Sequence, residues 1–341
     1  MKKKTMTIHD LAELAGVSVA TVSRSLNGSS LVREKTKQRI LDLAADMRFE
    51  INASAKGLAT SKVDTIGVIL PSEYDKFGPQ QYYASLMDDL RDSLERSNYD
   101  LIVSFANNRI TNKSNILRLV DRHKVDGLII LRENIDQSVL DWLEKENVPY
   151  VFSHHPPKSD GFIYDAIFTD HVWGGKLAGE HLAALGCRKI LCISLDVKTR
   201  QFEQRESGFC KSLTDKGIDF GAENILRCPW TIEDGYKVIK ENASQFLQAD
   251  GLFSVTDLLA FGAMQALKEL KIRIPQDISV IGYDDIPLSS SLRPKLTTIH
   301  QPREKIAQQT CLRLIEKIQK KEPVLGKFNL AIRPRLVIRE S

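Results

Sequence analysis

The segment AGVSVATVSRSLNG, residues 15–28, carries several small hydroxyl side chains next to one arginine. The hydroxyls of Ser18, Thr21 and Ser23 can donate hydrogen bonds to phosphate oxygens, as can backbone amides at the start of a helix. Arg24 can donate two hydrogen bonds to the edge of a guanine base. Small side chains also let a helix approach the major groove closely. This combination is typical of a surface that binds the DNA backbone and reads bases.

The pattern around this segment predicts two short helices joined by a tight turn. Thr7 can cap the first helix, and Asp10 lies at its third position, where a negative charge suits the helix dipole. Gly16 ends this helix, because a tight turn needs a residue that tolerates a positive φ angle. Ser18 can cap a second helix, which is expected over residues 19–26.

The second helix has an inner face and an outer face. Val22 and Leu26 are expected to face inward with Val17, and the outward-facing residues are expected to be Val19, Ala20, Ser23 and Arg24. Val19 and Ala20 have no hydrogen-bonding side chains. They either contact thymine methyl groups or are simply small enough to fit in the major groove. Two helices around a glycine turn form the helix-turn-helix pattern. The pattern alone leaves open an ordinary corner between two helices of a bundle.

The charge of the chain is concentrated at its N-terminal end. Residues 1–62 hold 11 of the 48 Lys and Arg but only 6 of the 44 Asp and Glu. This segment therefore carries +5, and the rest of the chain carries −1. The asymmetry indicates a small polyanion-binding head on a nearly neutral body.

A third helix follows, and its expected inner face holds Ile40, Leu41, Ala44 and Met47. Residues 49–62, FEINASAKGLATSK, have few large apolar side chains. They are predicted to be a linker that forms one or two helical turns, which are too short to be stable alone in water.

From Val63 onward, apolar β-branched runs alternate with amphipathic segments. The expected strands cover residues 65–71, 99–105, 125–131 and 148–153 in a first series, and 165–170, 189–195, 251–255 and 277–285 in a second. Helices are expected near 82–97, 113–123 and 137–146. This alternation predicts doubly wound α/β sheets, and the two series predict two lobes. The C-terminal NLAIRPRLVIRES consists of strand-type residues, and no heptad tail follows that would form a coiled-coil tetramer.

The sequence lacks the motifs that are typical of several classes of protein. There is no Gly-rich dinucleotide or phosphate loop, so no cofactor is expected. There is no G-x-S-x-G spacing and no histidine in a triad setting, so an enzyme is not expected. The 5 cysteines form no C-x-x-C pair, which argues against a disulfide framework and against a zinc site.

The chain has no apolar run near the roughly 20 residues of a membrane helix, and no membrane partner is expected. Its basic start lacks the apolar region of a signal peptide, because His9, Asp10 and Glu13 interrupt it. The expected location is the cytoplasm, at the nucleoid when the protein is bound to DNA.

The N-terminal TIHDLAELAGVSVATVSRSLN resembles the DNA-binding head of the LacI/GalR family of bacterial transcription regulators. The body resembles the family's core, which is similar to periplasmic sugar-binding proteins, through DHVWGGKLAGEHLAALGCRKILCIS, RESGF, TDLLAFGAMQALKEL and IPQDISVIGYDDIPLSSSLRPKLTTIHQP. The resemblance implies an all-α head with a hinge helix and an α/β body of two doubly wound lobes. The residues then expected at DNA are Thr7, Ser18, Val19, Ala20, Thr21, Ser23, Arg24, Asn27, Asn52, Ala55, Lys56 and Leu58.

INASAKGLATSKVDTIGVILP resembles the family's hinge, which becomes helical on the operator. By resemblance, Leu58 enters the minor groove at the central base step, where an apolar wedge kinks DNA. This chain has Ile51 where the family has Pro, and Lys56 where it has Arg. Because lysine lacks the planar fork of arginine, modestly altered hinge contacts are expected.

The family binds a small-molecule effector in the cleft between the lobes, in line with the rule that α/β sheets bind ligands beyond the carboxyl ends of their strands. By resemblance, the effector-binding residues are Tyr82, Tyr83, His154, Arg205, Trp230, Asp257 and Asp284. Charged groups bind hydroxyls and aromatic faces bind the C–H side of a ring, so a sugar-type effector is expected.

Several of these residues have an alternative role. Asp257 is also placed to cap the helix that starts at Leu258, and either Asp284 or Asp285 is suited to a structural role. The aromatic residues are also suited to the core. The chain departs from the family's usual Asp-Asn by placing His171 at the Asn position, and the segment around 72–81 is longer than usual.

The expected domains are a head over 1–48, a hinge over 49–62, and an effector-binding and dimerisation domain over 63–341. The expected lobes within the body are 63–163 with 297–325, and 164–296 with 326–341. The sequence thus predicts a dimeric regulator, mostly a repressor in this family, that binds a palindromic operator. The alternative is a solute-binding protein of the periplasmic type without DNA activity.

Overall fold

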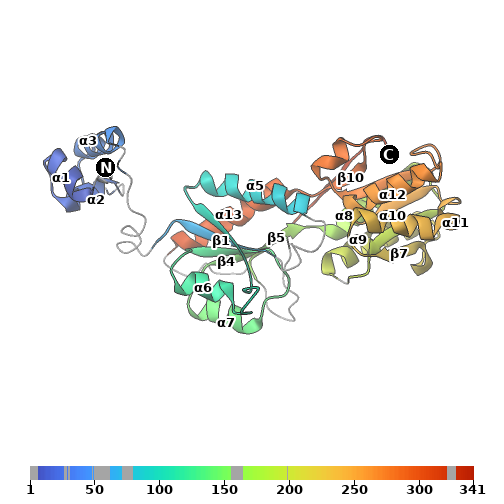
Figure 1. Cartoon of the computed structure of the whole chain (residues 1–341), viewed down its shortest axis with the longest axis horizontal. Helices are drawn as coiled ribbons and strands as arrows, with labels where there is room; N and C mark the ends of the chain where they lie inside the picture. Colours follow the sequence, from blue (N-terminus) through green and yellow to red (C-terminus); the bar gives the residue numbers. More distant parts are fainter. Residues whose placement is uncertain are drawn as a thin grey trace. The chain divides into compact units, whose positions relative to one another are not determined.

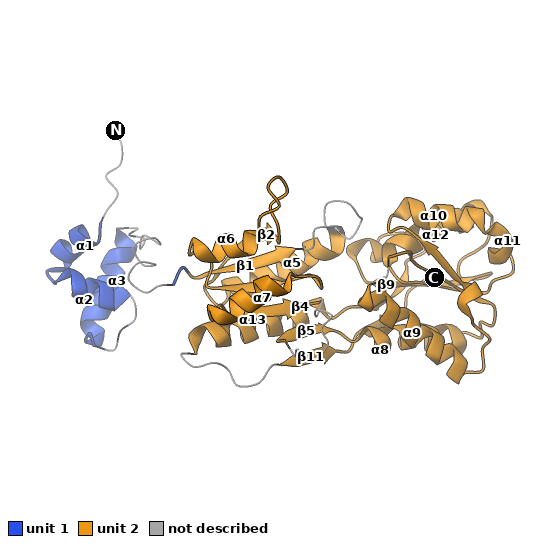
Figure 2. Ribbon diagram, turned by 90° about the horizontal axis from the view of Figure 1, so that it is seen from below, with its two compact units in different colours: residues 1–63 blue, residues 64–341 orange. Residues whose placement is uncertain are grey.

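The structure is a computed structural model. It describes residues 7–26, 29, 31–47, 49, 62–70, 80–154, 164–197, 199–320 and 328–341. Five expected DNA contacts lie outside the described residues: Asn27, Asn52, Ala55, Lys56 and Leu58. The chain divides into two compact units, residues 1–63 and 64–341 (Figure 2).

The described residues of the first unit form three helices: α1 (Ile8–Ala15), α2 (Val19–Leu26) and α3 (Glu34–Asp46). Thr7 caps α1, and its side chain and that of Asp10 exchange hydrogen bonds with each other's backbone, as a capping box. Gly16 has φ 62°, so the predicted left-handed turn between the helices is confirmed. Ser18 Oγ accepts a hydrogen bond from the amide of Thr21 at 3.2 Å, which confirms the second cap.

The core of this unit is small and is formed by all three helices. Leu11, Val22 and Ile40 are fully buried in it. Leu41 and Met47, expected on the inner face of α3, are only partly buried, and Leu43 packs against the core instead. Arg39 of α3 donates a hydrogen bond to the carbonyl oxygen of Ala15, where the end of α1 attracts a positive charge.

The second unit consists of two lobes, each built on a six-stranded sheet (Figure 1). The sheet of the first lobe has the order β11-β5-β4-β3-β1-β2 and is parallel throughout. Its strands are β1 (Thr65–Leu70), β2 (Asp100–Phe105), β3 (Gly127–Ile130), β4 (Tyr150–Ser153), β5 (Ala166–Thr169) and β11 (Asn329–Ile332).

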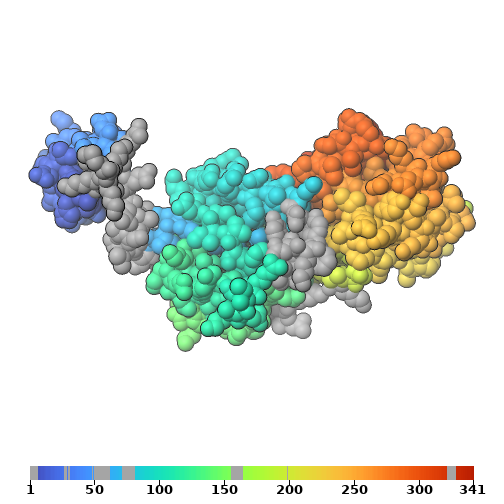
Figure 3. Space-filling view, viewed as in Figure 1, coloured from blue at the N-terminus to red at the C-terminus, as the bar shows by residue number. Residues whose placement is uncertain are grey.

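The sheet of the second lobe has the order β12-β10-β9-β8-β6-β7. Its strands are β6 (Ile190–Leu195), β7 (Ile225–Cys228), β8 (Gly251–Ser254), β9 (Ser279–Asp284), β10 (Thr297–His300) and β12 (Arg335–Val337). Only β12 runs antiparallel, alongside β10. In the space-filling view, light-blue to green segments form much of the visible surface of the first lobe, and yellow to orange segments form much of that of the second (Figure 3).

The predicted strands are confirmed with ends that differ by at most two residues, but the structure adds β7 and β10. β7 is a short edge strand whose residues are mostly solvent-accessible, so it lacks the continuous apolar run of its neighbours.

The lobe boundaries expected from the sequence are wrong in three places. β5 was expected to open the second lobe, yet it pairs with β4 and β11 in the first. β10 was expected in the first lobe, yet it pairs with β9. β11 was expected in the second lobe. The chain crosses between the lobes after each of these strands, and the composition of a short strand does not reveal which sheet it joins.

Helices cover both faces of each sheet (Figure 1). In the first lobe, α5 (Gln80–Glu95) and α13 (Arg303–Gln319) share one core, while α6 (Asn115–Asp121) and α7 (Gln137–Lys145) cover the other face. In the second lobe, α8 (His171–Ala184) packs against α9 (Arg200–Asp215). On the opposite face α12 (Asp257–Glu269) packs against α10 (Ile232–Glu241), followed by the short α11 (Ala243–Phe246) (Figure 2).

Glycines allow α8 and α9 to approach closely. A Cβ atom on Gly175 would lie 2.0 Å from the carbonyl oxygen of Arg205, and one on Gly208 would lie 2.0 Å from that of Val172. This contact holds the backbone of α9 at the position from which Arg205 extends.

Candidate functional site

The outer face of α2 is available for binding. Ser18, Ala20 and Arg24 are exposed, and Thr21 and Ser23 are partly exposed. This arrangement agrees with the expected phosphate and base contacts.

Two of the expected DNA contacts have an additional role in the fold. Val19, expected to face outward, is partly buried and packs against the core of the head, because it lies beside the turn that joins the helices. The hydroxyl of Thr7 lies 2.7 Å from a carboxylate oxygen of Asp10, so it already has a partner within the capping box.

A cavity lies in the second unit, in the kind of place where small-molecule sites of α/β proteins occur. Both lobes line it, and they do so at the carboxyl ends of their strands. The lining residues are Tyr82, Tyr83, His154, His171, Gln201, Phe202, Arg205, Trp230, Thr256, Leu258, Asp284, Ile286 and Gln301. All the expected effector residues except Asp257 are therefore brought together at one cavity.

Arg205 is only 2 % exposed and contacts four neighbouring residues. Its Nη1 donates to the carbonyl oxygen of Val255 at 2.6 Å and to Oδ1 of Asp284 at 3.1 Å. Its Nε lies 3.4 Å from Nδ1 of His171, and its guanidinium lies 3.8 Å from the ring centre of Tyr283.

Asp284 connects the cavity to two of the crossings between the lobes. Its Oδ1 also accepts a hydrogen bond from Nε2 of Gln301 at 2.8 Å, and Oε1 of Gln301 accepts one from Thr169 at 2.9 Å. Thr169 ends β5 and Gln301 follows β10, so this chain of contacts joins the two lobes. Burial raises the pKa of Asp284, and the charge of Arg205 opposes that rise. The backbone of Asp284 has φ 119°, a conformation that is rare outside glycine and occurs where surroundings impose it.

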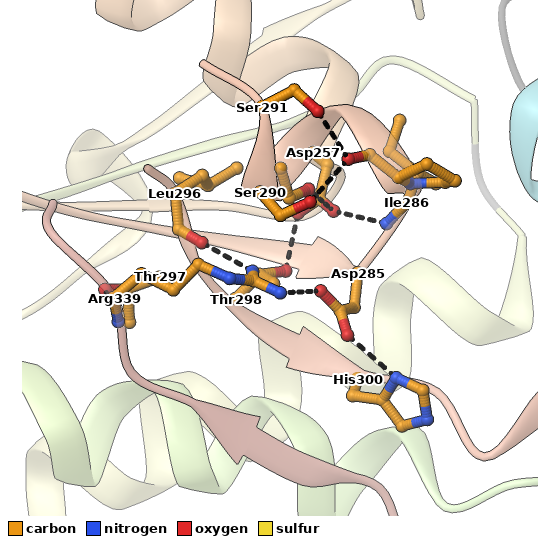
Figure 4. A network of polar contacts seen from close by, with 12 residues as sticks. Asp257, Asp285, Ile286, Ser290, Ser291, Leu296, Thr297, Thr298, His300 and Arg339 are labelled. Atoms are coloured by element: carbon orange, nitrogen blue, oxygen red, sulfur yellow. Dashed lines mark hydrogen bonds and ion pairs between the residues drawn. The ribbon is translucent and has the colours of Figure 1, made fainter. Parts of the chain in front are cut away.

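Asp257 does not face the cavity, which corrects the expectation for this residue. It is fully buried, and its carboxyl group binds Thr298 Oγ1 at 2.5 Å, Ser289 Oγ at 2.7 Å and the amide of Ile286 at 3.0 Å (Figure 4). Burial, and then the charge of Asp284, raise its pKa to about 8. Asp257 therefore joins α12, β10 and the segment after β9 beneath the cavity. The alternative capping role is also wrong, because the side chain of Thr256 caps α12.

Asp285 has the structural role that the sequence left open between two neighbouring carboxylates. It binds Arg339 Nη2 at 2.5 Å and His300 Nδ1 at 2.9 Å (Figure 4). These two partners outweigh the effect of burial and lower its pKa to about 2. Asp285 points away from the cavity, whereas Asp284 lines it.

The first lobe contributes aromatic and imidazole groups. The ring of Tyr82 lies 5.9 Å from that of Tyr83 and 5.8 Å from that of His154, edge to face in both cases. The hydroxyl of Tyr82 is buried and has no hydrogen-bond partner among the described residues, and burial raises its pKa. An unpaired buried hydroxyl at a cavity wall is a favourable position for a polar group of a ligand.

The second lobe offers an aromatic platform. The rings of Trp230 and Phe202 lie 4.9 Å apart, edge to face, and Trp230 is partly exposed. Such a face suits the C–H side of a saturated ring. Trp230 thus both packs on the core and lines the cavity, so its two expected roles coexist.

The site includes residues that sequence reasoning missed. His171 was noted only as a departure from the family, yet it lines the cavity and contacts Arg205 and Tyr283. Gln301 follows a strand that was not predicted, so no local signal marked it. The other lining residues that were not predicted are Gln201, Phe202, Thr256, Leu258 and Ile286.

Two other kinds of feature are not found in the described part of the chain. No group of three or more His, Cys, Asp or Glu side chains there is arranged to hold a metal ion. No described helix is long and apolar enough to cross a membrane.

Known families match the two parts of the chain. Residues 7–52 match the model of bacterial regulatory proteins of the lacI family, and residues 180–341 match a periplasmic binding protein-like domain. A helix-turn-helix unit joined to such a domain defines a class of DNA-binding transcriptional regulators that respond to a small molecule.

Curated relatives extend this match over nearly the whole chain. The HTH-type transcriptional repressor PurR of Photorhabdus laumondii is 32 % identical over 98 % of this chain and 96 % of its own length. PurR of Erwinia tasmaniensis is 30 % identical with the same coverage. The chain belongs to the lacI family of bacterial regulatory proteins.

Solved structures agree with this assignment. The lac repressor dimer bound to operator and the anti-inducer ONPF is 29 % identical, with a TM-score of 0.77 over 99 % of both chains. A LacI family regulator of Enterococcus faecium with bound ribose is 30 % identical, with a TM-score of 0.70 over 81 % of this chain and 98 % of that one. The helix-turn-helix match contradicts the alternative of a solute-binding protein without a DNA-binding domain.

Proposed function

We propose that this protein is a transcriptional repressor that binds a palindromic operator as a dimer and is controlled by a sugar-type effector in the cavity. The observation that carries the proposal is one chain that combines an exposed helix-turn-helix face with a cavity lined by both lobes. The lac repressor, similar over the full length, is a dimer on its operator, and a relative of similar identity binds ribose.

The cavity suits control by a ligand. Arg205 and Asp284 belong to the second lobe, Tyr82 and His154 to the first, and Gln301 lies at a crossing between them. A ligand that contacts both lobes stabilises the lobe arrangement in which its contacts are best. If that arrangement also changes operator affinity, then DNA must change effector affinity by the same factor.

The outer face of α2 supports base reading by Arg24, and the hydroxyls of Ser18 and Thr21 support phosphate contacts. The hinge contacts of Asn52, Ala55, Lys56 and Leu58, and the contact of Asn27, remain part of the proposal on the strength of the family resemblance. We also infer that the protein acts in the cytoplasm without a catalytic role, since its named relatives are repressors.

The test is a selection of binding sites from random double-stranded DNA by the purified protein at a stated salt concentration. We expect an enriched near-palindrome with two half-sites about one helical turn apart and a central step that unstacks easily. The selection is repeated with a metabolite extract, which supplies a co-repressor if one is needed. If the selection enriches no sequence under either condition, the proposal is contradicted.

A further inference from the structure

The charged groups that line the cavity compensate each other. Among the described lining residues, Arg205 and Asp284 are the side chains with a full charge, and they form an ion pair at 3.1 Å. Asp257 lies behind Asp284, and its pKa of about 8 keeps it protonated at neutral pH. The second carboxyl group therefore adds no charge to the site.

The hydrogen-bond network makes His171, one of the two lining histidines, neutral. Nδ1 of His171 lies 3.4 Å from Nε of Arg205, which can only donate, and 3.0 Å from the hydroxyl of Tyr283. Nδ1 must therefore be an acceptor, and the ring proton lies on Nε2. Because a protonated imidazole has no acceptor, His171 is uncharged.

His154 is only 4 % exposed, and its Nδ1 lies 3.0 Å from Ser153 Oγ. Such burial disfavours a charged imidazolium ring. Burial raises the pKa of Tyr82, so its hydroxyl is neutral as well. Because Arg205 and Asp284 compensate each other, the described lining has no net charge.

We propose that the cavity is built for an uncharged effector, a neutral sugar or glycoside, and that it excludes phosphorylated and carboxylated analogues. This inference rests on the proposed function, in which the cavity is the effector site. An anionic ligand would lose its hydration there without gaining a free counter-charge, because Asp284 already neutralises Arg205. The hydroxyl of Tyr82 has no hydrogen-bond partner among the described residues, so it is left for the ligand and suits a hydroxyl group.

The test uses inorganic phosphate as the probe and removes the compensating charge. Asp284→Asn leaves Arg205 uncompensated, and asparagine tolerates positive φ angles better than most residues. The matched control is Asp285→Asn, which makes the same charge change at the adjacent carboxylate that binds His300 and Arg339. Phosphate is titrated into each full-length protein at pH 7 by isothermal calorimetry.

We expect the Asp284→Asn variant to bind phosphate at least about tenfold more tightly than the wild type. The reason is that the variant lacks the carboxylate that compensates the charge of the buried Arg205. Asp285→Asn is expected to behave like the wild type, and the double variant Arg205→Gln/Asp284→Asn is expected to lose the gain. Circular dichroism checks folding, and Asp284→Ser replaces Asp284→Asn if the latter is unfolded.

Tight phosphate binding by the wild type would overturn the inference, as would the absence of any gain in the folded Asp284 variants. An equal gain in Asp285→Asn would do the same, since it would indicate a general charge effect. None of these results affects the operator selection, because that experiment measures DNA binding by the N-terminal head. A failure of the charge inference is therefore distinguishable from a failure of the regulator proposal.

Discussion

At the scale of single residues, neighbouring carboxylates in this protein have different roles because their surroundings differ. Asp284 lines the cavity and binds Arg205, whereas Asp285 binds His300 and Arg339 on the other side of the chain. Asp257 is enclosed by hydroxyl groups and an amide. Burial without a cation raises the pKa of Asp257, and two basic partners lower the pKa of Asp285.

Arg24 is the residue that we expect to read a base. Arg24→Ala should weaken specific operator binding by about 1–3 kcal/mol, because a bidentate guanine contact is lost. The measurement is a pair of titrations with the selected operator and a scrambled sequence. Arg33→Ala, which removes the same charge from an exposed residue outside α2, is the control. An Arg24→Ala variant that still prefers the operator as strongly as the wild type would remove Arg24 from the base-reading role.

Asp257 makes the stability of the protein depend on pH. Its pKa is about 8 in the folded protein, above the ordinary value near about 3.9, so between these values the folded state holds a proton that the unfolded state has lost. Stability is therefore expected to fall as the pH rises from about 5 to about 8, by at most about 1.4 kcal/mol per pH unit.

Asp257→Asn should remove this contribution, since asparagine mimics the protonated acid and does not titrate. Urea unfolding at several pH values measures the effect. The expected result is a stability of the variant that changes less between pH 5 and 8 than that of the wild type. Parallel pH profiles would show that Asp257 does not hold the proton.

At the scale of elements, the position of Arg205 depends on the contact between α8 and α9. The two helices approach so closely that Gly175 faces the backbone of Arg205 and Gly208 faces that of Val172. α8 also starts with His171, which contacts the Arg205 side chain. One helix pair therefore sets both the backbone and the side chain of the cavity's arginine.

Gly175→Ala tests this contact. The added Cβ would lie 2.0 Å from the carbonyl oxygen of Arg205, so the helices must separate. We expect a loss of about 1–3 kcal/mol in unfolding free energy, the usual range for overpacking. Ser207→Ala, at an exposed position of α9, is the control and should change stability by no more than about 0.5 kcal/mol. A variant as stable as the wild type would mean that the two helices can separate without cost.

At the scale of the whole molecule, the two compact units divide the functions between them. The first unit has its own core of buried residues from three helices, and the second has cores on both of its sheets. The excess positive charge lies in the first. Regulation then requires that the state of the cavity be transmitted through the segment that joins the units.

Removal of the first unit separates the two functions. A protein that consists of residues 64–341 should remain folded, because this unit contains its own cores. It should lose operator binding, and with Asp284→Asn it should still gain phosphate binding, because the cavity lies entirely within it. Gel-shift assays and calorimetry measure the two properties. An unfolded product would show that the body depends on the head.

The sequence alone predicted the features that depend on short stretches of chain. The cap at Thr7, the turn at Gly16, the eight named strands and the resemblance of the head all follow from patterns within a few residues. Tertiary structure decided which side chains meet. Thr169 and Gln301 are 132 residues apart and bond only because β5 and β10 end where the chain crosses between the lobes. Asp284, which lines the cavity, and Asp257, which is buried beneath it, likewise bind residues distant in sequence, Gln301 and Thr298. Local hydrogen bonds and apolar periodicity depend on residues that are close in sequence. The pairing of short strands and the direction of a buried carboxylate depend on segments that are distant in sequence.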